Sequence, residues 1–328
     1  MANCEVHTYT YKEVNELQLT LDVTYPPGYN DNDHKSNLTV LLHLHGGFLV
    51  IGEKSTLPPT WLINTCAHRG WAYATASYRL LPEAAGLDVL SDCIDAATWT
   101  AANIANKLIL AGSSAGGYLA VATAAHPRAP PISAVLSIYG MVNLTDERYI
   151  RPGRGLRGSD ENLAATLSEI ESVMVGSTVV DGCPFPSSSP TTARRLAWVS
   201  ALHEAAWYPD VLTRIPGLTG RIRAEGLAVI PQRWRALFPL AFGMTEKFPP
   251  TAVLHGDEDV LVEFKQSEIL VKRLKSLGVN VLLENAAGEG HGFEAKEAID
   301  LDVDIPSDAV KEFRASLKSI VDFLERHV

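Results

Sequence analysis

The chain has 328 residues, of which 46% are hydrophobic and 20% are charged, so it is long enough to bury a core without disulfide or metal supports. Its 28 basic and 38 acidic residues give a formal net charge of −10, and an acidic surface repels phosphate backbones and anionic lipids. These values exclude a disordered, collagen-like or coiled-coil chain. They also argue against nucleic acid or a membrane surface as a partner.

The four cysteines are too few for a disulfide scaffold and too dispersed for a zinc knuckle. The first residues carry neither the basic nor the apolar region of a secretory signal. No apolar run approaches the ~20 residues that a membrane span needs. We therefore expect a cytoplasmic protein.

The predicted strands begin at the N-terminus, where residues 6–14 and 17–25 form two runs. The second run alternates apolar with mostly polar residues, which is typical of a half-buried strand. Further short, nearly continuous apolar runs predict strands covered on both faces. These runs are residues 38–44, 72–77, 108–111, 134–139, 251–254 and 279–283.

Helical patterns separate these runs at residues 60–68, 88–106, 117–125 and 262–277, and a last helix is expected after Pro306-Ser307. Strands that alternate with helices predict an α/β fold with a mostly parallel central sheet and helices on both faces.

One segment interrupts this alternation. The stretch between the strand predicted at 134–139 and the one predicted at 251–254 is far longer than an ordinary connection between strands. We interpret residues 141–249 as a cap inserted into a core of residues 1–140 and 250–328. An independent second domain is less favoured, because both ends of the segment return to one sheet. Helical stretches are expected within it at residues 162–175, 191–206 and 232–242.

A G-x-S-x-G sequence at residues 112–116 lies between a predicted strand and a predicted helix, with Ser114 in its middle. In that context the pattern predicts a nucleophile elbow, a tight turn that exposes the serine and directs the backbone N–H of Ala115 at a developing oxyanion. Taken alone, the motif could also be a glycine-rich helix start without chemical consequence, although the elbow is favoured.

Three other segments support the catalytic interpretation, because each follows a predicted strand. They contain His45-Gly46-Gly47-Phe48, Asp259 and His291. An imidazole can take the serine proton near pH 7, and a carboxylate can fix the imidazole tautomer. Asp257 and Glu258 compete with Asp259 for the carboxylate role, and Asp259 is favoured because it lies beyond the turn at Gly256.

In combination, these motifs resemble the α/β-hydrolase superfamily, and within it the hormone-sensitive-lipase-like esterases and small carboxylesterases. The resemblance rests on residues 45–47, 78–83, 112–117, 255–262 and 291–293. It implies a catalytic triad of Ser114, His291 and Asp259. It also implies an oxyanion hole made by the N–H groups of Gly47 and Ala115, with Gly46 or Phe48 contributing.

Two departures limit what the resemblance implies about the substrate. Phe48 stands where the family usually has a third glycine, so we expect its ring to narrow the acyl side of the pocket. The N-terminal cap helices of the family are missing from the pattern, so the cap is expected to come from the insertion. A relative of the arylformamidase type stays open, as does a homodimer.

The sequence therefore predicts a serine hydrolase that cleaves a carboxylic ester of a medium-sized, largely apolar small molecule, without a cofactor or metal. His43 and His45 alternate on one strand, but no third metal ligand is evident. Arg79 is expected to anchor its loop through Glu83 or backbone carbonyls. The alternatives are a tailoring thioesterase, acyltransferase or lactonase, an amidase, and a non-catalytic ligand-binding protein.

Overall fold

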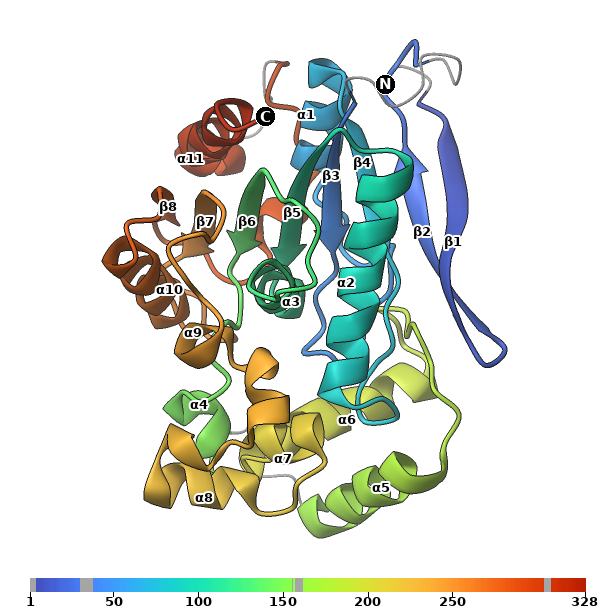
Figure 1. Cartoon of the computed structure of the whole chain (residues 1–328), viewed down its shortest axis with the longest axis vertical. Coiled ribbons are helices and arrows are strands. Elements are labelled where there is room, and N and C mark those ends of the chain that lie inside the picture. The colour runs from blue at the N-terminus through green and yellow to red at the C-terminus, as the bar shows by residue number, and fades with distance from the viewer. Residues whose placement is uncertain (1–3, 30–37, 155, 157–161, 304–307) are drawn as a thin grey trace.

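One sheet organises the computed structural model, which describes residues 4–29, 38–154, 156, 162–303 and 308–328 (Figure 1). Within these residues the sheet has eight strands in the order β1-β2-β4-β3-β5-β6-β7-β8. The six strands from β4 to β8 in this order run parallel, whereas β2 pairs antiparallel with both β1 and β4. The predicted mostly parallel sheet is confirmed.

The strands lie close to the predicted runs. Every residue of β3, β4, β6 and β7 is buried, as expected for central strands covered on both faces. The bounds are β1 (Val6–Val14), β2 (Leu17–Thr24), β3 (Thr39–Leu44), β4 (Ala72–Ala76), β5 (Lys107–Ser113), β6 (Ala134–Ile138), β7 (Thr251–Gly256) and β8 (Val281–Ala286).

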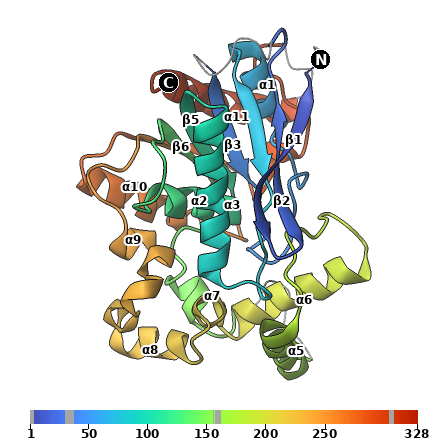
Figure 2. The same cartoon turned by 45° about the vertical axis from the view of Figure 1, so that its right-hand side comes forward.

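Helices cover both faces of the sheet, and each face has its own apolar cluster. Helices α2 (Gly86–Asn103), α3 (Ala115–Ala124) and α10 (Lys265–Ser276) pack on one face. Helices α1 (Thr60–Arg69) and α11 (Asp308–Glu325) pack on the other (Figures 1 and 2). None of the helices in the described part of the chain could span a membrane.

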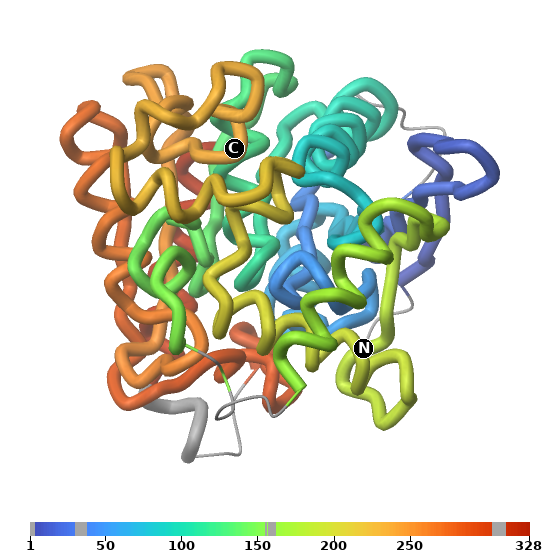
Figure 3. The backbone as a smooth tube through the Cα atoms, turned by 90° about the horizontal axis from the view of Figure 1, so that it is seen from below, coloured from blue at the N-terminus to red at the C-terminus, as the bar shows by residue number. Residues whose placement is uncertain are grey.

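Residues 141–249, which we call the insert, connect β6 to β7 and are largely helical. Figure 3 looks at the molecule from the side of these helices, which spread across one end of the sheet. Their bounds are α4 (Glu147–Ile150), α5 (Leu163–Gly176), α6 (Pro190–Glu204), α7 (Tyr208–Thr213), α8 (Leu218–Glu225), the 3-10 helices η2 (Leu227–Val229) and η3 (Gln232–Leu237), and α9 (Pro239–Phe242).

Three elements differ from their sequence predictions for local reasons. The helix predicted at 117–125 begins at Ala115, because Ser114 is its N-cap. The helix predicted at 88–106 spans residues 86–103, since the side chain of Asp88 bonds back to the N–H of Ala85 and fixes an earlier start. The single helix predicted at 232–242 is a 3-10 helix followed by a short α-helix that begins at Pro239.

Arg195 joins α6 of the insert to the rest of the fold. Its guanidinium donates to the carbonyl oxygens of Val50 at 2.7 Å and Leu81 at 3.1 Å, and it forms an ion pair with Glu83. The Arg195 and Glu83 side chains are only 4% and 6% exposed, so the pair is shielded from solvent. Because Val50 belongs to the loop after β3, this contact couples the insert to the Gly46-Gly47 segment.

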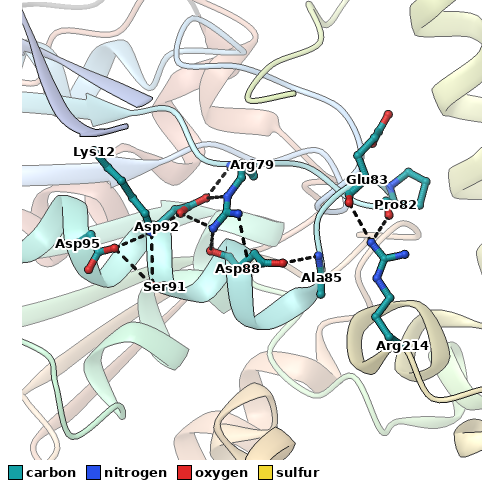
Figure 4. A network of polar contacts seen from close by, with 10 residues as sticks. All are labelled: Lys12, Arg79, Pro82, Glu83, Ala85, Asp88, Ser91, Asp92, Asp95 and Arg214. Carbon is teal, nitrogen blue, oxygen red and sulfur yellow. Dashed lines mark hydrogen bonds and ion pairs between the residues drawn. The ribbon is translucent and has the colours of Figure 1, made fainter. Parts of the chain in front are cut away.

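The expectation that Arg79 pairs with Glu83 is wrong, since Glu83 is engaged by Arg195. Arg79 instead binds Asp92 of α2 through two guanidinium nitrogens, at 2.8 and 2.9 Å, and through its backbone N–H (Figure 4). It also donates to the carbonyl of Asp88, so the expected contact with a backbone carbonyl is present. Asp92 is fully buried and also accepts from Lys12, so two cations neutralise one buried carboxylate.

Asp92→Asn is expected to lower the free energy of unfolding by about 3 kcal/mol, because it removes the buried partner of Arg79 and leaves only the half-exposed Asp88 to pair with it. The matched control is Asp95→Asn, which removes the other partner of Lys12 at a site 36% exposed and should cost less than about 1 kcal/mol. Urea denaturation measures both values. Equal losses in the two variants would contradict this assignment of the buried pair.

Candidate active site

Ser114 lies in the sharp turn between β5 and α3, with φ 58° and ψ −117°. A side chain at positive φ is uncommon and costs about 1–3 kcal/mol, so the surrounding structure must hold it there. The N–H of Ser114 donates to the carbonyl of Ile138 at 2.8 Å, and its own carbonyl accepts from Tyr118 and Met141. The turn is thus tied to the end of β6 and to the first turn of α3.

The glycines of the 112–116 motif allow the backbone to pass close to its neighbours. A Cβ at Gly116 would lie 1.9 Å from the carbonyl oxygen of Leu44, and one at Gly112 would lie 2.1 Å from the carbonyl oxygen of Gly116. Both distances are far below any real contact. These glycines are therefore required by packing, and they set the position of Ser114 relative to the end of β3.

Asp259 and His291 come from the loops after β7 and β8 and meet beside this turn. The ring Nδ1 of His291 donates to Oδ2 of Asp259 at 2.6 Å. This bond fixes the neutral imidazole as the tautomer whose Nε2 accepts a proton. Ser114 and His291 both line one cavity, and the side chain of His291 is 17% exposed.

The Asp259 carboxylate is buried and held by several donors. Its Oδ1 accepts from the backbone N–H groups of Leu261 and Val262, each at 2.9 Å. Burial alone would raise its pKa, but hydrogen bonds from His255 and His291 outweigh burial and hold the pKa well below its usual range. Asp259 therefore stays ionised and supports a positive charge on His291.

The two competing acidic residues of this loop face elsewhere. Asp257 accepts from the side chain of Asn285 at 3.0 Å and from the N–H of Gly288 at 2.7 Å, so it joins its own loop to the loop after β8. Glu258 is exposed. The geometry brings only Asp259 of these three into contact with His291.

The backbone N–H groups that could form an oxyanion hole lie next to the same turn. Within the described residues no carbonyl accepts from the backbone N–H groups of Gly47, Phe48 or Ala115. Gly47 has φ +114°, and a Cβ at Gly46 would lie 3.2 Å from Cβ of Ser114. The glycine loop after β3 therefore approaches the serine closely, and its N–H groups are available to donate to a ligand oxygen.

A cavity of about 530 Å³ opens above these groups. Most of its surface is apolar, and its lining includes no aspartate, glutamate, lysine or arginine among the described residues. The lining residues are Gly46, Gly47, Phe48, Ile51, Thr56, Leu57, Ser113, Ser114, Tyr139, Leu156, Phe185, Ala193, Leu196, Ala197, Val199, Ser200, Leu261, His291 and Gly292.

Phe48 lies in this lining, and its ring meets the edge of His203 from α6 with ring centroids 5.0 Å apart. His203 is fully buried, and burial lowers its pKa to about 4, so a neutral ring packs against the phenyl group. Phe48 therefore contacts the insert directly.

His43 and His45 each have a hydrogen-bond partner, although Nε2 of His45 is buried and has none among the described residues. His43 lies 3.0 Å from the hydroxyl of Ser113 through Nε2. The ring of His45 stacks on Tyr78 with centroids 4.2 Å apart, and its Nδ1 donates to the carbonyl of Gly46. Burial lowers the pKa of His43 to about 3 and that of His45 to about 4, so both rings are neutral and support the loop around the turn.

Comparison with known proteins finds two family models and several relatives that match the chain. An α/β-hydrolase-fold family model matches residues 41–176, and a prolyl oligopeptidase family model matches residues 235–303. A probable carboxylesterase, M8 of Phoma sp., is 24% identical over 314 residues, which cover 87% of this chain and 88% of that protein.

The chain has the α/β-hydrolase fold. It is similar to esterase-like proteins, and its solved structural neighbours share the fold. The esterase of Pyrobaculum calidifontis superposes with a TM-score of 0.62 at 21% identity, covering 98% of this chain and 85% of that one. A propionate-bound esterase of Thermogutta terrifontis gives 0.61 at 18% identity, covering 98% and 94%.

Much larger fungal proteins also match this α/β hydrolase. The non-reducing polyketide synthase ascC of Acremonium egyptiacum is 28% identical over 324 residues, and Preu6 of Preussia isomera is 24% identical over 311. The matches cover 89% and 88% of this chain, but the chain spans only 14% of the length of either synthase.

Two residues of the α/β hydrolase that sequence reasoning missed lie next to His291. The ring of Tyr139 packs against the imidazole with centroids 4.4 Å apart, and its hydroxyl donates to Glu294 at 2.7 Å. Glu294 is fully buried, and burial raises its pKa to about 7, although the bond from Tyr139 acts in the opposite direction. The sequence signal that could have indicated this pair is Glu294 itself, a glutamate three residues after His291 between Phe293 and Ala295.

Glu294→Gln is expected to flatten the dependence of stability on pH. The folded-state pKa of Glu294 lies near 7, above its usual value of 4.5, so the folded protein keeps a proton that the unfolded chain releases between these values. Raising the pH from 5 to 8 should therefore destabilise the wild type by about 2 kcal/mol more than the variant.

Urea denaturation at the two pH values measures this difference. The control is Glu297→Gln, which removes an exposed carboxylate from the same loop and should keep the wild-type dependence. Identical pH dependence in the wild type and Glu294→Gln would contradict the raised pKa.

Proposed function

We propose that the protein is a serine hydrolase that cleaves a carboxylic ester of a medium-sized, largely apolar small molecule. The observation that carries the proposal is the bond between His291 Nδ1 and Asp259 Oδ2, made beside a cavity that His291 shares with Ser114. The similarity to the probable carboxylesterase of Phoma sp. supports the same reaction class.

In this mechanism the Oγ of Ser114 attacks the ester carbonyl carbon while Nε2 of His291 takes the hydroxyl proton. The negative charge that develops on the carbonyl oxygen is stabilised by the N–H groups of Gly47 and Ala115, with Phe48 or Gly46 contributing. His291 then gives the proton to the departing alcohol, and water attacks the acyl-enzyme by the same route. Asp259 stabilises the imidazolium in both halves.

The cavity chemistry supports an uncharged, apolar acyl group. A charged group would lose its hydration among these lining residues without meeting an opposite charge, which costs several kcal/mol. A volume of about 530 Å³ falls within the range of small-molecule sites. Phe48 and the lining face of α6 limit the shape of this group.

A second candidate function is release or transfer of an acyl group from a thioester, as a tailoring enzyme. The similarity to non-reducing polyketide synthases favours it, because these proteins are named for a chemistry that builds acyl chains. The same triad would attack a thioester, and the acceptor would be water or an alcohol.

A cytoplasmic location is also part of the proposal, supported by four free cysteines, three of them buried.

Covalent labelling tests the nucleophile. A fluorophosphonate probe is expected to label the wild type on Ser114, and Ser114→Ala should lose both the label and the turnover of p-nitrophenyl esters. Ser113→Ala is the matched variant and should keep the label, because its hydroxyl contacts His43 rather than the triad. Peptide mapping by mass spectrometry locates the label, and labelling of Ser114→Ala at wild-type rate would contradict the proposal.

Product analysis separates the two candidate functions. With paired ester and thioester substrates of one acyl group, the proposed esterase should give a kcat/KM for the ester equal to or above that for the thioester. A strong preference for the thioester would favour the second candidate, and formation of a new ester with added alcohol would indicate transfer.

The size of the acyl group is tested on α6. Ala197 lines the cavity and is exposed, so Ala197→Leu should fill part of the cavity without disturbing the core. We expect about a tenfold loss in kcat/KM for decanoyl relative to acetyl esters, a change of about 1.4 kcal/mol. Ala165→Leu, at an exposed position of α5 that is absent from the lining, is the control. An unchanged chain-length profile in Ala197→Leu would contradict the assignment of this face to the acyl site.

A further inference from the structure

Tyr139 is held in an unusual conformation against the imidazole of His291. It directly follows β6, has φ +37°, and is only 4% exposed. The interplanar angle between its ring and that of His291 is 51°, and Tyr139 also lines the cavity. A bulky residue at positive φ is rare, so the backbone at this point is constrained to present the ring to the imidazole.

Glu294 is bonded to the phenol of Tyr139 and is not among the residues that line the cavity. It belongs to the 3-10 helix η4 (Phe293–Ala295) and accepts from the phenol of Tyr139 through Oε1. Its second oxygen, Oε2, is buried and has no hydrogen-bond partner among the described residues. Burying a carboxyl group with only one of its oxygens hydrogen-bonded lowers the stability of the fold. An apolar side chain at this position would avoid that cost.

We propose that Tyr139 and Glu294 are a positioning pair for His291: Glu294 fixes the phenol, and the phenol ring fixes the imidazole between itself and Asp259. The inference rests on the proposed function, because it assigns His291 the role of general base. It adds two residues that the G-x-S-x-G, Asp and His motifs do not include.

The pair constrains the imidazole from two sides. Asp259 holds Nδ1 by a hydrogen bond, which leaves the ring free to swing about that bond. The Tyr139 ring packs on the imidazole and restricts that movement. Small displacements of a catalytic base cost large factors in rate, so a fixed ring plane contributes directly to catalysis.

The charge of Glu294 gives the pair a second effect. The ionisable groups that act on Glu294 are Tyr139, Lys296 and Asp259, and the Lys296 side chain is 61% exposed. Ionised Glu294 places a negative charge behind Tyr139, which favours the imidazolium form of His291. Because Glu294 titrates near neutral pH, this support for the imidazolium grows as the pH rises.

The test uses three variants of the full chain. Tyr139→Phe keeps the ring and removes the phenol donor, Glu294→Gln keeps an acceptor and removes the ionisation, and Glu297→Gln is the exposed control. The rate of fluorophosphonate labelling is measured from pH 5 to 9 alongside kcat and KM for one p-nitrophenyl ester. The His291 ring is titrated in parallel by NMR, a measurement that needs no turnover.

Tyr139→Phe should lower kcat and the labelling rate about tenfold with little change in KM. Glu294→Gln should move the acid limb of the labelling profile and the NMR titration of the His291 ring to lower pH, since the carboxylate no longer favours the imidazolium. Glu297→Gln should match the wild type in its labelling rate and in its His291 titration. A purely structural role would lower activity at every pH without moving the His291 titration.

Wild-type kcat and wild-type His291 titration in both Tyr139→Phe and Glu294→Gln would overturn the proposal. If Glu294→Gln fails to fold, Tyr139→Phe decides alone, because wild-type labelling and titration in that variant also overturn it. Failure of the proposed function has a different signature, namely equal labelling of the wild type and Ser114→Ala. In that case the NMR titration still reports whether the pair acts on His291.

Discussion

The contact on which the rest of the site depends is the close approach of the β5–α3 turn to the end of β3. Gly116 lies so near the carbonyl of Leu44 that no side chain fits between them. This approach forces Ser114 to positive φ and brings the Gly46–Gly47 loop within reach of its side chain. The strain is tolerated because parallel strands on both sides are fully buried and hydrogen-bonded, so the turn cannot relax without separating β3, β5 and β6.

A second constraint acts on the acid–base partners, which belong to loops rather than strands. Asp259 is fixed by two backbone N–H groups of its own loop, and its remaining oxygen holds His291. The same loop is joined to the next one through Asp257. One acidic residue therefore supports the loops and another supports the imidazole, which explains why adjacent carboxylates can have separate roles. Tyr139, whose phenol donates to Glu294, makes a further contact with the ring.

The parts of the site that could be predicted from the sequence are those with a local signature. Ser114, Asp259 and His291 each follow an apolar run, and parallel strands bring their carboxyl ends to one edge of the sheet. The partner of Arg79 could not be predicted in this way, because pairing with Asp92 across a loop and a helix leaves no fixed spacing. The same holds for Arg195, which crosses 112 residues to reach Glu83. Tertiary packing also breaks the helix expected at 232–242, where Pro239 starts a new one.

The positioning of His291 bears on which reaction the site favours. An alkoxide leaves with difficulty and needs a proton from the imidazolium as the carbon–oxygen bond breaks, whereas a thiolate leaves with much less assistance. In the proposed mechanism, ionised Asp259 and the Tyr139 ring, whose phenol is bonded to Glu294, would stabilise the imidazolium as the alcohol departs. Thioester cleavage would gain little from these groups. The buried carboxyl of Glu294 and the positive φ of Tyr139 therefore support the proposal of an oxygen ester over that of a thioester, even though the sequence is similar to segments of polyketide synthases.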